Sequence, residues 1–490
     1  MSQKVIVIGS GIAGLSAALR LRKKGYDVTV FESNAYPGGK LHAFESRGYQ
    51  FDYGPSLFTM PHLVDELFDL YELDSEQYFH YQQKDTICNY FWDDGTQFTV
   101  DADEQQFVAK AATTFTEPEA HIEKYLKNSR TKYDRTASIF LEKSLHKFNT
   151  YLSKETLKAL FSLRKLDLLG SLNGVNESYF SNPKLVQLFN RYATYNGSNP
   201  YHTPGIMSLI PQLEMRFGTF YPTGGMHSIT KSLHQLAVEQ GISFHFNERV
   251  EEVLTDGKKT TGIRTEKDQY EAQTVVCNMD VFSAYQTLLK KEKKPNKILA
   301  QERSSSALIF YWGIKKTFNE LDLHNIFFSN DYPKEFDFIF NKRSLFDDPT
   351  VYLNITSKEE PSQAPDGCEN WFVMINAPGN DGQDWESLKA QSKISILKKL
   401  SMNLGEAIEP LIETETVLDP VRIETETLSH QGSLYGTSSN SKLAAFLRHP
   451  NFSSTVENLY FCGGSAHPGG GIPLCLLSAK IVSDLIPNSK

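Results

Sequence analysis

Apolar residues form an unbroken run at the start of the chain and then recur at helical spacing. Val5 to Ile8 is a continuous β-branched stretch, which is typical of a parallel strand buried on both faces. The small-residue segment 15–25 predicts a helix that ends at Gly25, and residues 27–32, DVTVFE, predict a second strand. This order of strand, helix and strand predicts a nucleotide-binding α/β unit.

A similar pattern returns near the other end of the chain. Residues 458–464, NLYFCGG, predict a short buried strand, and residues 472–486 predict a helix whose buried face carries leucine and isoleucine at helical spacing. Pro473 suits the first turn of that helix, where its missing N–H costs nothing.

Between these ends, three further segments carry clear patterns. Residues 250–265 predict a hairpin that turns at Asp256 and Gly257. The apolar runs Ser306 to Ile314 and Phe336 to Phe340 both predict buried strands, whose rings are candidates for the wall of an apolar tunnel or for plain core.

The turn after the first strand contains a glycine motif for binding a dinucleotide. Gly9 permits the tight turn, Gly11 lets the backbone approach a pyrophosphate, and Gly14 lets helix and strand pack closely. Glu32 ends the second strand, where a carboxylate accepts hydrogen bonds from ribose hydroxyls and would repel a 2′-phosphate.

Two more glycine turns favour FAD over NAD. Gly39 and Lys40 follow the acidic residue closely, where NAD-binding units usually continue into another helix and strand, and the stretch that ends in Pro55 and Ser56 would bring backbone near the flavin ring. The three glycines 469–471 would let the last helix aim its N-terminus at the negative charge of a reduced flavin. Both ends of the chain are therefore expected to share one FAD, and no second G-x-G-x-x-G unit for NAD occurs.

Composition narrows the class of partner and the compartment. The net charge of −9 argues against nucleic acid as the main partner, and the five cysteines form no C-x-x-C pair, which fits a reducing compartment. A buried strand that begins at Lys4 leaves no room for a signal peptide, and no run of about 18 apolar residues could span a bilayer. We expect a cytoplasmic protein. The histidines show no metal-binding spacing, so we expect no metal.

Several stretches together resemble the bacterial-type carotenoid desaturases, the phytoene desaturase family among the amine-oxidase-like flavoproteins. The resemblance covers most of the chain, and H-P-G-x-G-I-P near its end is the most specific motif. The stretches are VIVIGSGIAGLSAA (5–18), YPGGK (36–40), FDYGPSLFTMP (51–61), RYATYNGSNPY (191–201), GTFYPTGGMHSITKSL (218–233) and LYFCGGSAHPGGGIPLCLLSAK (459–480).

The resemblance implies FAD as cofactor, a carotenoid polyene as substrate, and peripheral attachment to the inner face of the cell membrane. It also implies a set of FAD contacts, with Val250 meeting the adenine through its backbone and Asn278 and Asp280 on the pyrophosphate side. The contacts it adds to the glycines named above are Ser10, Ala13, Glu32, Lys40, Ser56, Leu57, Val250, Asn278, Asp280, Gly464, Gly471, Ile472 and Pro473.

Within the family, GPSLFTMPHLVDELF resembles the hydroxycarotenoid 3,4-desaturases more than the phytoene enzymes. One feature departs from the family: many members carry a basic residue three positions after an aspartate, but here Gly170 follows Asp167 at that spacing. The resemblance implies desaturation by hydride transfer to flavin, which leaves an allylic cation and demands no strong base. No catalytic residue is assigned, and for His467 we prefer a turn-stabilising hydrogen bond to a proton shuttle.

The expected fold class is α/β, with a Rossmann-like FAD-binding domain interleaved with an α+β substrate domain. Residues 1–85, 218–290 and 425–490 would form the FAD domain, and residues 86–217 and 291–424 the substrate domain. Residues 154–172, with leucines among lysines and arginine, predict an amphipathic helix that either faces a membrane or packs on the core.

Four functions besides the 3,4-desaturase stay open. One is a phytoene desaturase. Another is an amine oxidase, although nothing in the sequence marks a site for a charged amine. A third is a carotenoid isomerase, which would keep FAD without net oxidation of its substrate. The fourth is a non-enzymatic lipid-binding protein of the same fold, which would not need both flavin-binding ends intact. The oligomeric state is not predicted.

Overall fold

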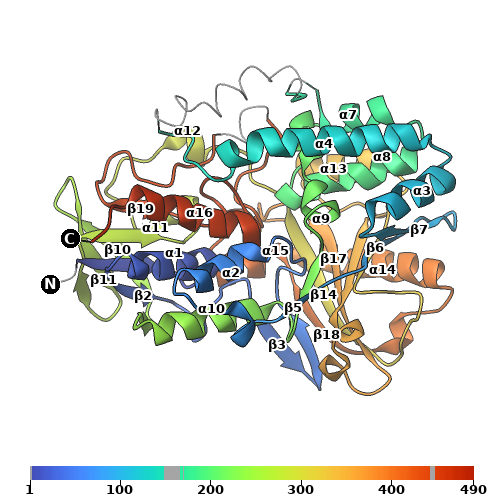
Figure 1. Cartoon of the computed structure of the whole chain (residues 1–490). Helices are drawn as coiled ribbons and strands as arrows, with labels where there is room; N and C mark the ends of the chain where they lie inside the picture. The colour runs from blue at the N-terminus through green and yellow to red at the C-terminus, as the bar shows by residue number, and fades with distance from the viewer. Residues whose placement is uncertain (1–2, 148–165, 169, 442–446, 490) are drawn as a thin grey trace.

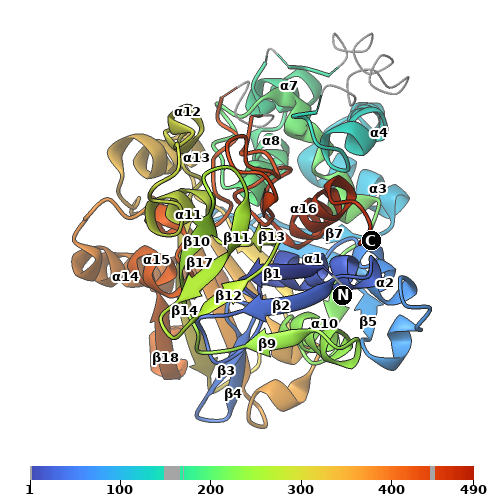
Figure 2. The ribbon, with the colours of Figure 1, turned by 90° about the vertical axis from the view of Figure 1, so that its left-hand side faces the viewer.

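The computed structural model describes residues 3–147, 166–168, 170–441 and 447–489. A parallel sheet gathers strands from the beginning, the middle and the end of the chain, in the order β19-β13-β1-β2-β9. Figure 2 views this sheet with the three-stranded sheet beside it. The strands are β1 (Lys4–Ile8), β2 (Asp27–Phe31), β9 (Ser243–His245), β13 (Thr274–Cys277) and β19 (Leu459–Phe461).

Helices cover one face of the parallel sheet and a second, smaller sheet lies by its other face. Helix α1 packs against both α16 and α10, and the cluster they form with β1 and β2 contains Val7, Leu19, Leu233 and Val482, all fully buried. The helices are α1 (Ile12–Lys23), α2 (His62–Asp69), α10 (His227–Glu239) and α16 (Ile472–Leu485). The opposite cluster joins Ile6 and Val275 to the antiparallel strands and to α11. These elements are β10 (Val250–Thr255), β11 (Thr260–Thr265), β12 (Gln269–Glu271) and α11 (Val281–Thr287).

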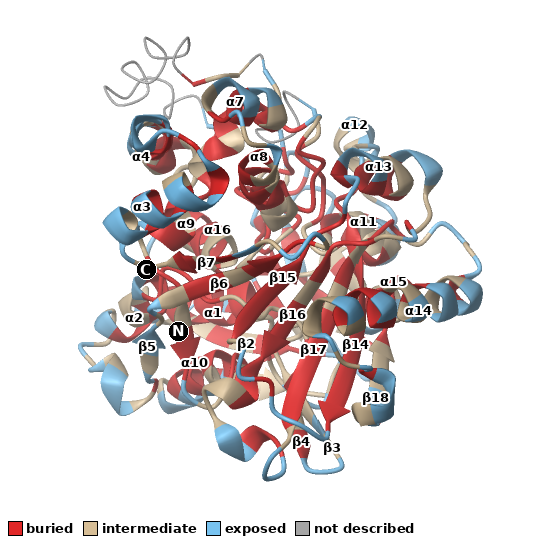
Figure 3. Ribbon diagram, turned by 90° about the vertical axis from the view of Figure 1, so that its right-hand side faces the viewer, coloured by how far each residue is buried: buried red, intermediate tan, exposed pale blue. Residues whose placement is uncertain are grey.

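A longer mixed sheet forms the other half of the molecule, on the right in Figure 1. Its order is β18-β14-β17-β16-β15-β6-β7, antiparallel except where β15 runs parallel to β6. Figure 3 shows its central strands as largely buried, because other elements pack on both faces. The strands are β6 (Thr86–Phe91), β7 (Gln97–Asp101), β14 (Ser306–Ile314), β15 (His324–Phe327), β16 (Val351–Ile355), β17 (Glu369–Ala377) and β18 (Ile412–Leu418).

The two faces of this sheet meet different partners. Helix α14 (Trp385–Leu404) buries Ile396 and Leu400 against the side of β14 that carries Trp312. The hairpin of β3 (Ala43–Ser46) and β4 (Tyr49–Asp52) packs Tyr49 and Phe51 against the opposite side, around Tyr311. The chain segment after the first glycine motif therefore reaches across to the second half of the molecule.

A helical layer stands over the edge of the sheet that ends in β6 and β7. Its core holds Phe107, Tyr125, Phe189 and Tyr192, all buried, and it continues into Phe328 near the end of β15. The elements are α3 (Glu104–Phe115), α4 (Glu119–Phe140), α7 (Leu172–Tyr179), α8 (Pro183–Asn190), η3 (Arg191–Asn196), η4 (Gly205–Leu209), α9 (Gln212–Met215) and α13 (Tyr332–Asp337).

Short elements complete the described chain. Strands β5 (Tyr81–Gln83) and β8 (Phe220–Pro222) pair antiparallel. The others are η1 (Ser75–Gln77), α12 (Asn296–Leu299), η5 (Phe338–Lys342), η6 (Thr356–Lys358), η7 (Pro361–Gln363), η8 (Glu409–Leu411), α15 (Pro420–Thr427) and η9 (His430–Gly432). None of the helices in the described ranges has the length and apolar character that a membrane span requires.

The predicted elements at the two ends, the hairpin turning at Asp256 and the strand 306–314 are confirmed. The strand predicted for 336–340 is wrong, because α13 and the π-helical turn η5 occupy these residues. Asp331 caps α13 by accepting a hydrogen bond from the Lys334 N–H at 3.1 Å, and Pro333 follows it in the first turn. A five-residue apolar run does not distinguish a buried helix from a strand, so these flanking residues decide.

Two predictions from the sequence are not tested by this arrangement. The amphipathic helix predicted for 154–172 lies mostly outside the described residues, which resume at 166–168. The residue limits of the FAD and substrate domains also stay a prediction, although the two sheets fall in the halves that those limits define.

Candidate functional site

One cavity of about 870 Å³ opens at the carboxyl ends of the parallel strands, where ligands bind in open α/β sheets. Its lining includes Ile8, Phe31, Asn278 and Gly463, which lie at the end of, or within two residues after, β1, β2, β13 and β19. The volume is near the upper end of the range for small-molecule sites, roughly 300–1,000 Å³. The cavity therefore has room for a large ligand that touches both ends of the chain.

The cavity brings together nearly every residue expected to contact FAD. Those that line it are Gly9, Gly11, Ala13, Glu32, Gly39, Lys40, Pro55, Ser56, Leu57, Val250, Asn278, Asp280, Gly464, Gly471, Ile472 and Pro473. Ser10 and Gly14 are not part of the lining. Ser10 donates from its N–H and its Oγ to Glu32 Oε2, at 2.9 and 2.8 Å, and Gly14 lies where α1 approaches the end of β1.

Glu32 is held in place from both of its oxygens. The second oxygen, Oε1, accepts hydrogen bonds from the N–H and the Nδ2 of Asn34, at 2.9 and 3.0 Å. The carboxylate is buried at the end of β2, so its orientation is fixed independently of a ligand. A carboxylate fixed there suits the two hydroxyls of a ribose.

The turn around Lys40 lies directly against the segment of Pro55. A Cβ on Gly54 would stand 2.3 Å from the Lys40 carbonyl oxygen, so only glycine allows the two backbones this close. The ammonium of Lys40 reaches the Ser433 and Leu434 carbonyl oxygens at 3.3 and 3.5 Å. Burial lowers the pKa of Lys40 to about 8, and nearby Asp280 opposes that shift.

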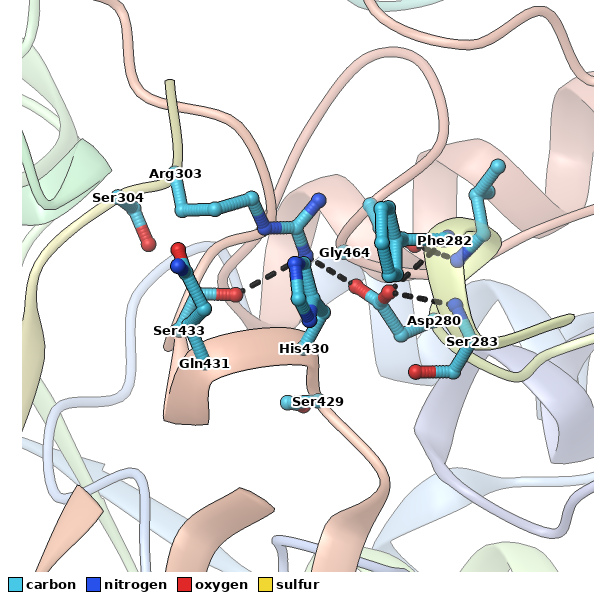
Figure 4. A network of polar contacts seen from close by, with 12 residues as sticks. Asp280, Phe282, Ser283, Arg303, Ser304, Ser429, His430, Gln431, Ser433 and Gly464 are labelled. Carbon is cyan, nitrogen blue, oxygen red and sulfur yellow. Dashed lines mark hydrogen bonds and ion pairs between the residues drawn. The ribbon is translucent and has the colours of Figure 1, made fainter. Parts of the chain in front are cut away.

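Asp280 belongs to a polar network at the start of α11, drawn in Figure 4. Its Oδ1 accepts from the Phe282 and Ser283 N–H groups, and its Oδ2 pairs with Arg303 Nη2 at 2.5 Å. The same Arg303 nitrogen donates to Ser433 Oγ at 3.0 Å. Because Arg303 neutralises the carboxylate, Asp280 can lie near a pyrophosphate without repelling it.

Arg448 is another cation in the cavity wall, and it is buried; no motif in the sequence indicated it. Its Nη1 donates to the carbonyl oxygens of Tyr435 and Gly464, at 2.7 and 3.4 Å. No carboxylate among the described residues forms an ion pair with Arg448, and burial lowers its pKa to about 10. A buried cation without an acid partner suits an anionic ligand.

These features fit FAD. The first turns of α1 and α16 meet the cavity, and the N–H groups of a first helical turn have no acceptor within the helix. Lys40 and Arg448 would supply positive charge for a diphosphate or a reduced flavin, and Glu32 would suit the hydroxyls of a ribose. No signal in the sequence distinguishes Arg448, because its place beside Gly464 depends on the folded chain.

The cavity continues past this region into an apolar section between the mixed sheet and the helical layer. Its walls come from α4, η3, η4, β16 and β17. The residues include Tyr133, Phe140, Leu141, Ile206, Met207, Leu209, Ile210, Leu213, Tyr352, Phe372 and Met374. No aromatic ring from residues 306–314 or 336–340 lines the cavity. The rings of these two segments are therefore part of the core, and Ile309 is the residue of 306–314 that reaches the cavity wall.

Two polar candidates from the sequence lie outside the cavity. His467 is buried, its Nε2 lies 3.0 Å from the Lys143 carbonyl oxygen, and burial lowers its pKa to about 4. This arrangement favours the turn-stabilising role. Asp167 pairs with Lys132 at 2.5 Å, so its basic partner comes from α4 and not from position 170. Neither residue is part of the described lining.

The residues that the structure describes also contain no cluster of three or more potential metal ligands.

The fold and the cavity define a flavin-dependent oxidoreductase whose cavity includes a large apolar section. The chain belongs to the family of flavin-containing amine oxidoreductases, whose family model matches residues 12–487. FAD is its cofactor, as the sequence predicts.

The most informative relatives are carotenoid enzymes. The chain is 60% identical over 487 residues to the 1-hydroxycarotenoid 3,4-desaturase of a Flavobacterium species, covering 99% of both chains. It is 33% identical over 495 residues to the 4,4'-diapolycopene oxygenase of a Methylomonas species, covering 99% of this chain and 98% of that one. The resemblance to the carotenoid desaturases, and to their hydroxycarotenoid branch, is confirmed.

Solved structures agree on the fold. An oxidoreductase from Methanosarcina mazei matches with a TM-score of 0.65 at 15% identity, covering 98% of this chain and 100% of that one. The cyclohexylamine oxidase of Brevibacterium oxydans matches with a TM-score of 0.62 at 14% identity, covering 99% of this chain and 98% of that one. Identities this low support the fold class alone.

We expect the affinity for FAD to fall as the pH rises past the pKa of Lys40. Below about pH 8 the free protein already carries the ammonium that an FAD phosphate prefers, whereas above it binding must first take up a proton. The dissociation constant should therefore rise toward tenfold per pH unit between about pH 8 and about pH 9. Fluorescence titration of apoprotein with FAD measures it.

Two variants serve as controls for this pH dependence. Lys40→Arg should bind with little change over that range, because the guanidinium stays charged. Lys40→Met should bind more weakly and also without the pH slope. If Lys40→Met kept the slope of the unmodified protein, another group would be responsible.

Proposed function

We propose that this protein is an FAD-dependent desaturase that introduces the 3,4 double bond into a 1-hydroxycarotenoid. The observation that carries the proposal is that the residues that fit FAD and an apolar section line the same cavity. The 60% identity to a 1-hydroxycarotenoid 3,4-desaturase over nearly the whole chain supports the substrate and the bond.

The residues that would hold FAD divide by the part of the cofactor that each fits. Glu32 and Val250 lie at the adenosine end, while Gly11, Lys40 and Arg448 suit the diphosphate or the charge of a reduced flavin. The segment of Pro55 to Leu57 and the first turn of α16 would adjoin the ring. When bound, FAD supplies a two-electron acceptor for a hydride from a C–H bond.

The chain's own contribution is to orient the polyene and to exclude water. The walls from α4, η4 and α9 carry Phe140, Ile206 and Leu213, and with Leu141 just after α4 they form an apolar surface for a polyene. Binding a long apolar molecule there removes apolar area from water, which contributes about 25 cal/mol per Å². Holding one C–C bond in a fixed position, away from water, lowers the barrier without a strong base.

We also propose that the protein works at the inner surface of the cell membrane, on its cytoplasmic side. A carotenoid is lipid-soluble, so an enzyme that takes one up must approach the bilayer. Residues 154–172, mostly outside the described chain, have the amphipathic pattern suited to that contact.

Anaerobic reduction tests the reaction. Purified protein with bound FAD is mixed with liposomes that carry a 1-hydroxycarotenoid or phytoene, and the flavin absorbance band is followed while the products are identified. Loss of the band with the hydroxycarotenoid, together with a product containing the new 3,4 bond, is the expected result. Bleaching with phytoene alone would instead indicate the early step of the pathway.

An isomerase and a lipid-binding protein would each give a different result in the same experiment. An isomerase would change the geometry of the polyene without net oxidation, so the substrate and product would have the same mass. A lipid-binding protein would bind the carotenoid and leave both FAD and substrate unchanged.

A further inference from the structure

A chain of hydrogen bonds stands in the wall of the cavity where the predicted flavin segment meets the apolar section. Ser56 Oγ lies 2.9 Å from the Tyr352 hydroxyl, and that hydroxyl lies 2.8 Å from His324 Nδ1. All three residues line the cavity, and they come from distant parts of the sequence. We refer to Ser56, Tyr352 and His324 as the polar chain.

The charged groups that act on His324 and Tyr352 are held in ion pairs. Arg191 Nη2 donates to Glu214 Oε2 at 2.9 Å, and both side chains are buried. The hydroxyls of Tyr192 and Tyr195 donate to the two oxygens of the same carboxylate. The charges of Arg191 and Glu214 cancel within this ion pair, so it does not require a charged ligand.

The polar chain itself is neutral and has hydrogen-bonding capacity left. Burial lowers the pKa of His324 to about 3 and raises that of Tyr352, so neither is charged at neutral pH. A serine hydroxyl can make three hydrogen bonds, and Ser56 Oγ makes one among the described residues. Ser56 and Tyr352 are only half-buried, so both are exposed to the cavity.

This chemistry suits an uncharged hydroxyl group on an otherwise apolar ligand. An alcohol both donates and accepts, so it can extend a chain of hydroxyls in either direction. In an apolar wall, leaving a hydroxyl without a hydrogen-bond partner costs more than in water. A site with such hydroxyls therefore discriminates strongly between a ligand that carries a hydroxyl group and one that lacks it.

The position along the cavity is also right for a 1-hydroxycarotenoid. In that molecule only one carbon, C2, separates the hydroxyl-bearing carbon from the C3–C4 bond. The hydroxyl must therefore bind next to the place where the reaction occurs. Ser56 adjoins Pro55, and that segment packs against the turn of Lys40, on the cofactor side of the cavity.

We propose, on the basis of the function proposed above, that Ser56 and Tyr352 bind the 1-hydroxyl group of the carotenoid. They select hydroxylated end groups and set the position of the 3,4 bond. His324 orients the Tyr352 hydroxyl through Nδ1 and acts as a positioning residue. The polyene extends from this point along the apolar section.

The test compares two substrates that differ only in the hydroxyl group. The specificity constant kcat/KM is measured in liposomes for a 1-hydroxycarotenoid and for the same carotenoid with hydrogen at C1, with products identified. The unmodified protein should prefer the hydroxylated substrate by about a hundredfold or more. Tyr352→Phe should reduce this ratio about tenfold, and adding Ser56→Ala should reduce it further.

Tyr90→Phe is the matched control, because Tyr90 is a buried tyrosine on β6 of the same sheet and is not part of the described cavity lining. It should keep the full preference. FAD content and melting temperature are measured for every variant, so that a loss of selectivity is separated from a loss of folding. A fall in kcat as well as a rise in KM is expected, because the hydroxyl positions the reacting bond.

Failure of this inference can be told apart from failure of the proposed function. If the unmodified protein forms the 3,4 bond with strong preference and both variants keep that preference, the assignment of Ser56 and Tyr352 is overturned. If it oxidises both substrates equally, the hydroxyl is not recognised and the inference is likewise overturned. If it oxidises neither, the proposed function itself is wrong.

Discussion

Replacing Gly14 with valine is expected to give a protein that binds no FAD. A Cβ at this position would stand 2.0 Å from the Gly9 carbonyl oxygen and 2.9 Å from Asn278 Nδ2. The first of these atoms is backbone at the end of β1, so the contact can be relieved only by separating α1 from the strand. That separation would move the first turn of α1 away from the cavity.

The ratio of flavin to protein absorbance after purification measures this effect, and thermal unfolding measures the accompanying loss of stability. Gly174→Ala is the control, because Gly174 lies inside α7 and its Cβ would meet nothing closer than 3.4 Å. Removing a helical glycine should leave stability unchanged or raise it by about 1 kcal/mol. Gly14→Val protein that purified with a full complement of FAD would contradict the fit of the cofactor to the first glycine turn.

Arg448→Met is expected to act in opposite directions on stability and on cofactor binding. In the free protein the guanidinium is buried against carbonyl oxygens, so replacing it with an apolar side chain of similar length removes a desolvated charge. Removing a buried charge that has no ion-pair partner relieves its desolvation cost, which offsets the loss of the two hydrogen bonds to carbonyl oxygens. The apoprotein should therefore melt at the same or a higher temperature, while the dissociation constant for FAD should rise about a hundredfold, because a charged hydrogen bond is worth about 1.5–3 kcal/mol.

Two further variants separate charge from packing in this experiment. Arg448→Lys keeps a cation at the site and should retain part of the affinity. Arg130→Met removes an arginine that pairs with Glu104 at 2.5 Å on the surface, and it should leave FAD binding unchanged. If Arg448→Met lowered the melting temperature of the apoprotein and left the affinity for FAD unchanged, Arg448 would have a structural role and no role in cofactor binding.

The sequence predicts the parts of this site that depend on local chemistry. Gly9, Gly11 and Gly14 before a small-residue helix, and Glu32 at the end of the next strand, form one unit of adjacent elements. Pro473 likewise identifies the start of α16. These predictions need no knowledge of the rest of the chain, because the strands and helices are neighbours in sequence.

Other features depend on contacts between distant residues, and no local pattern reveals them. Arg303 neutralises Asp280 from outside the motif that contains the aspartate, and Lys132 replaces the basic residue expected after Asp167. Tyr352 meets Ser56 across 296 positions of sequence. The strand prediction for residues 336–340 was wrong for a different reason, since the apolar pattern of this segment fits both a helix and a strand.

The parallel sheet also has a consequence for how the protein is made. Its edge strand β19 comes from residues 459–461, and α16, which packs on α1, ends at Leu485. On the ribosome, the first glycine turn therefore emerges long before the elements that complete the cavity. A nascent chain cannot close the cavity around FAD until residues 459–485 have emerged. Capture of the cofactor must wait for these elements, and once bound it stabilises the folded chain by mass action. Sequence separations this large also favour slow folding.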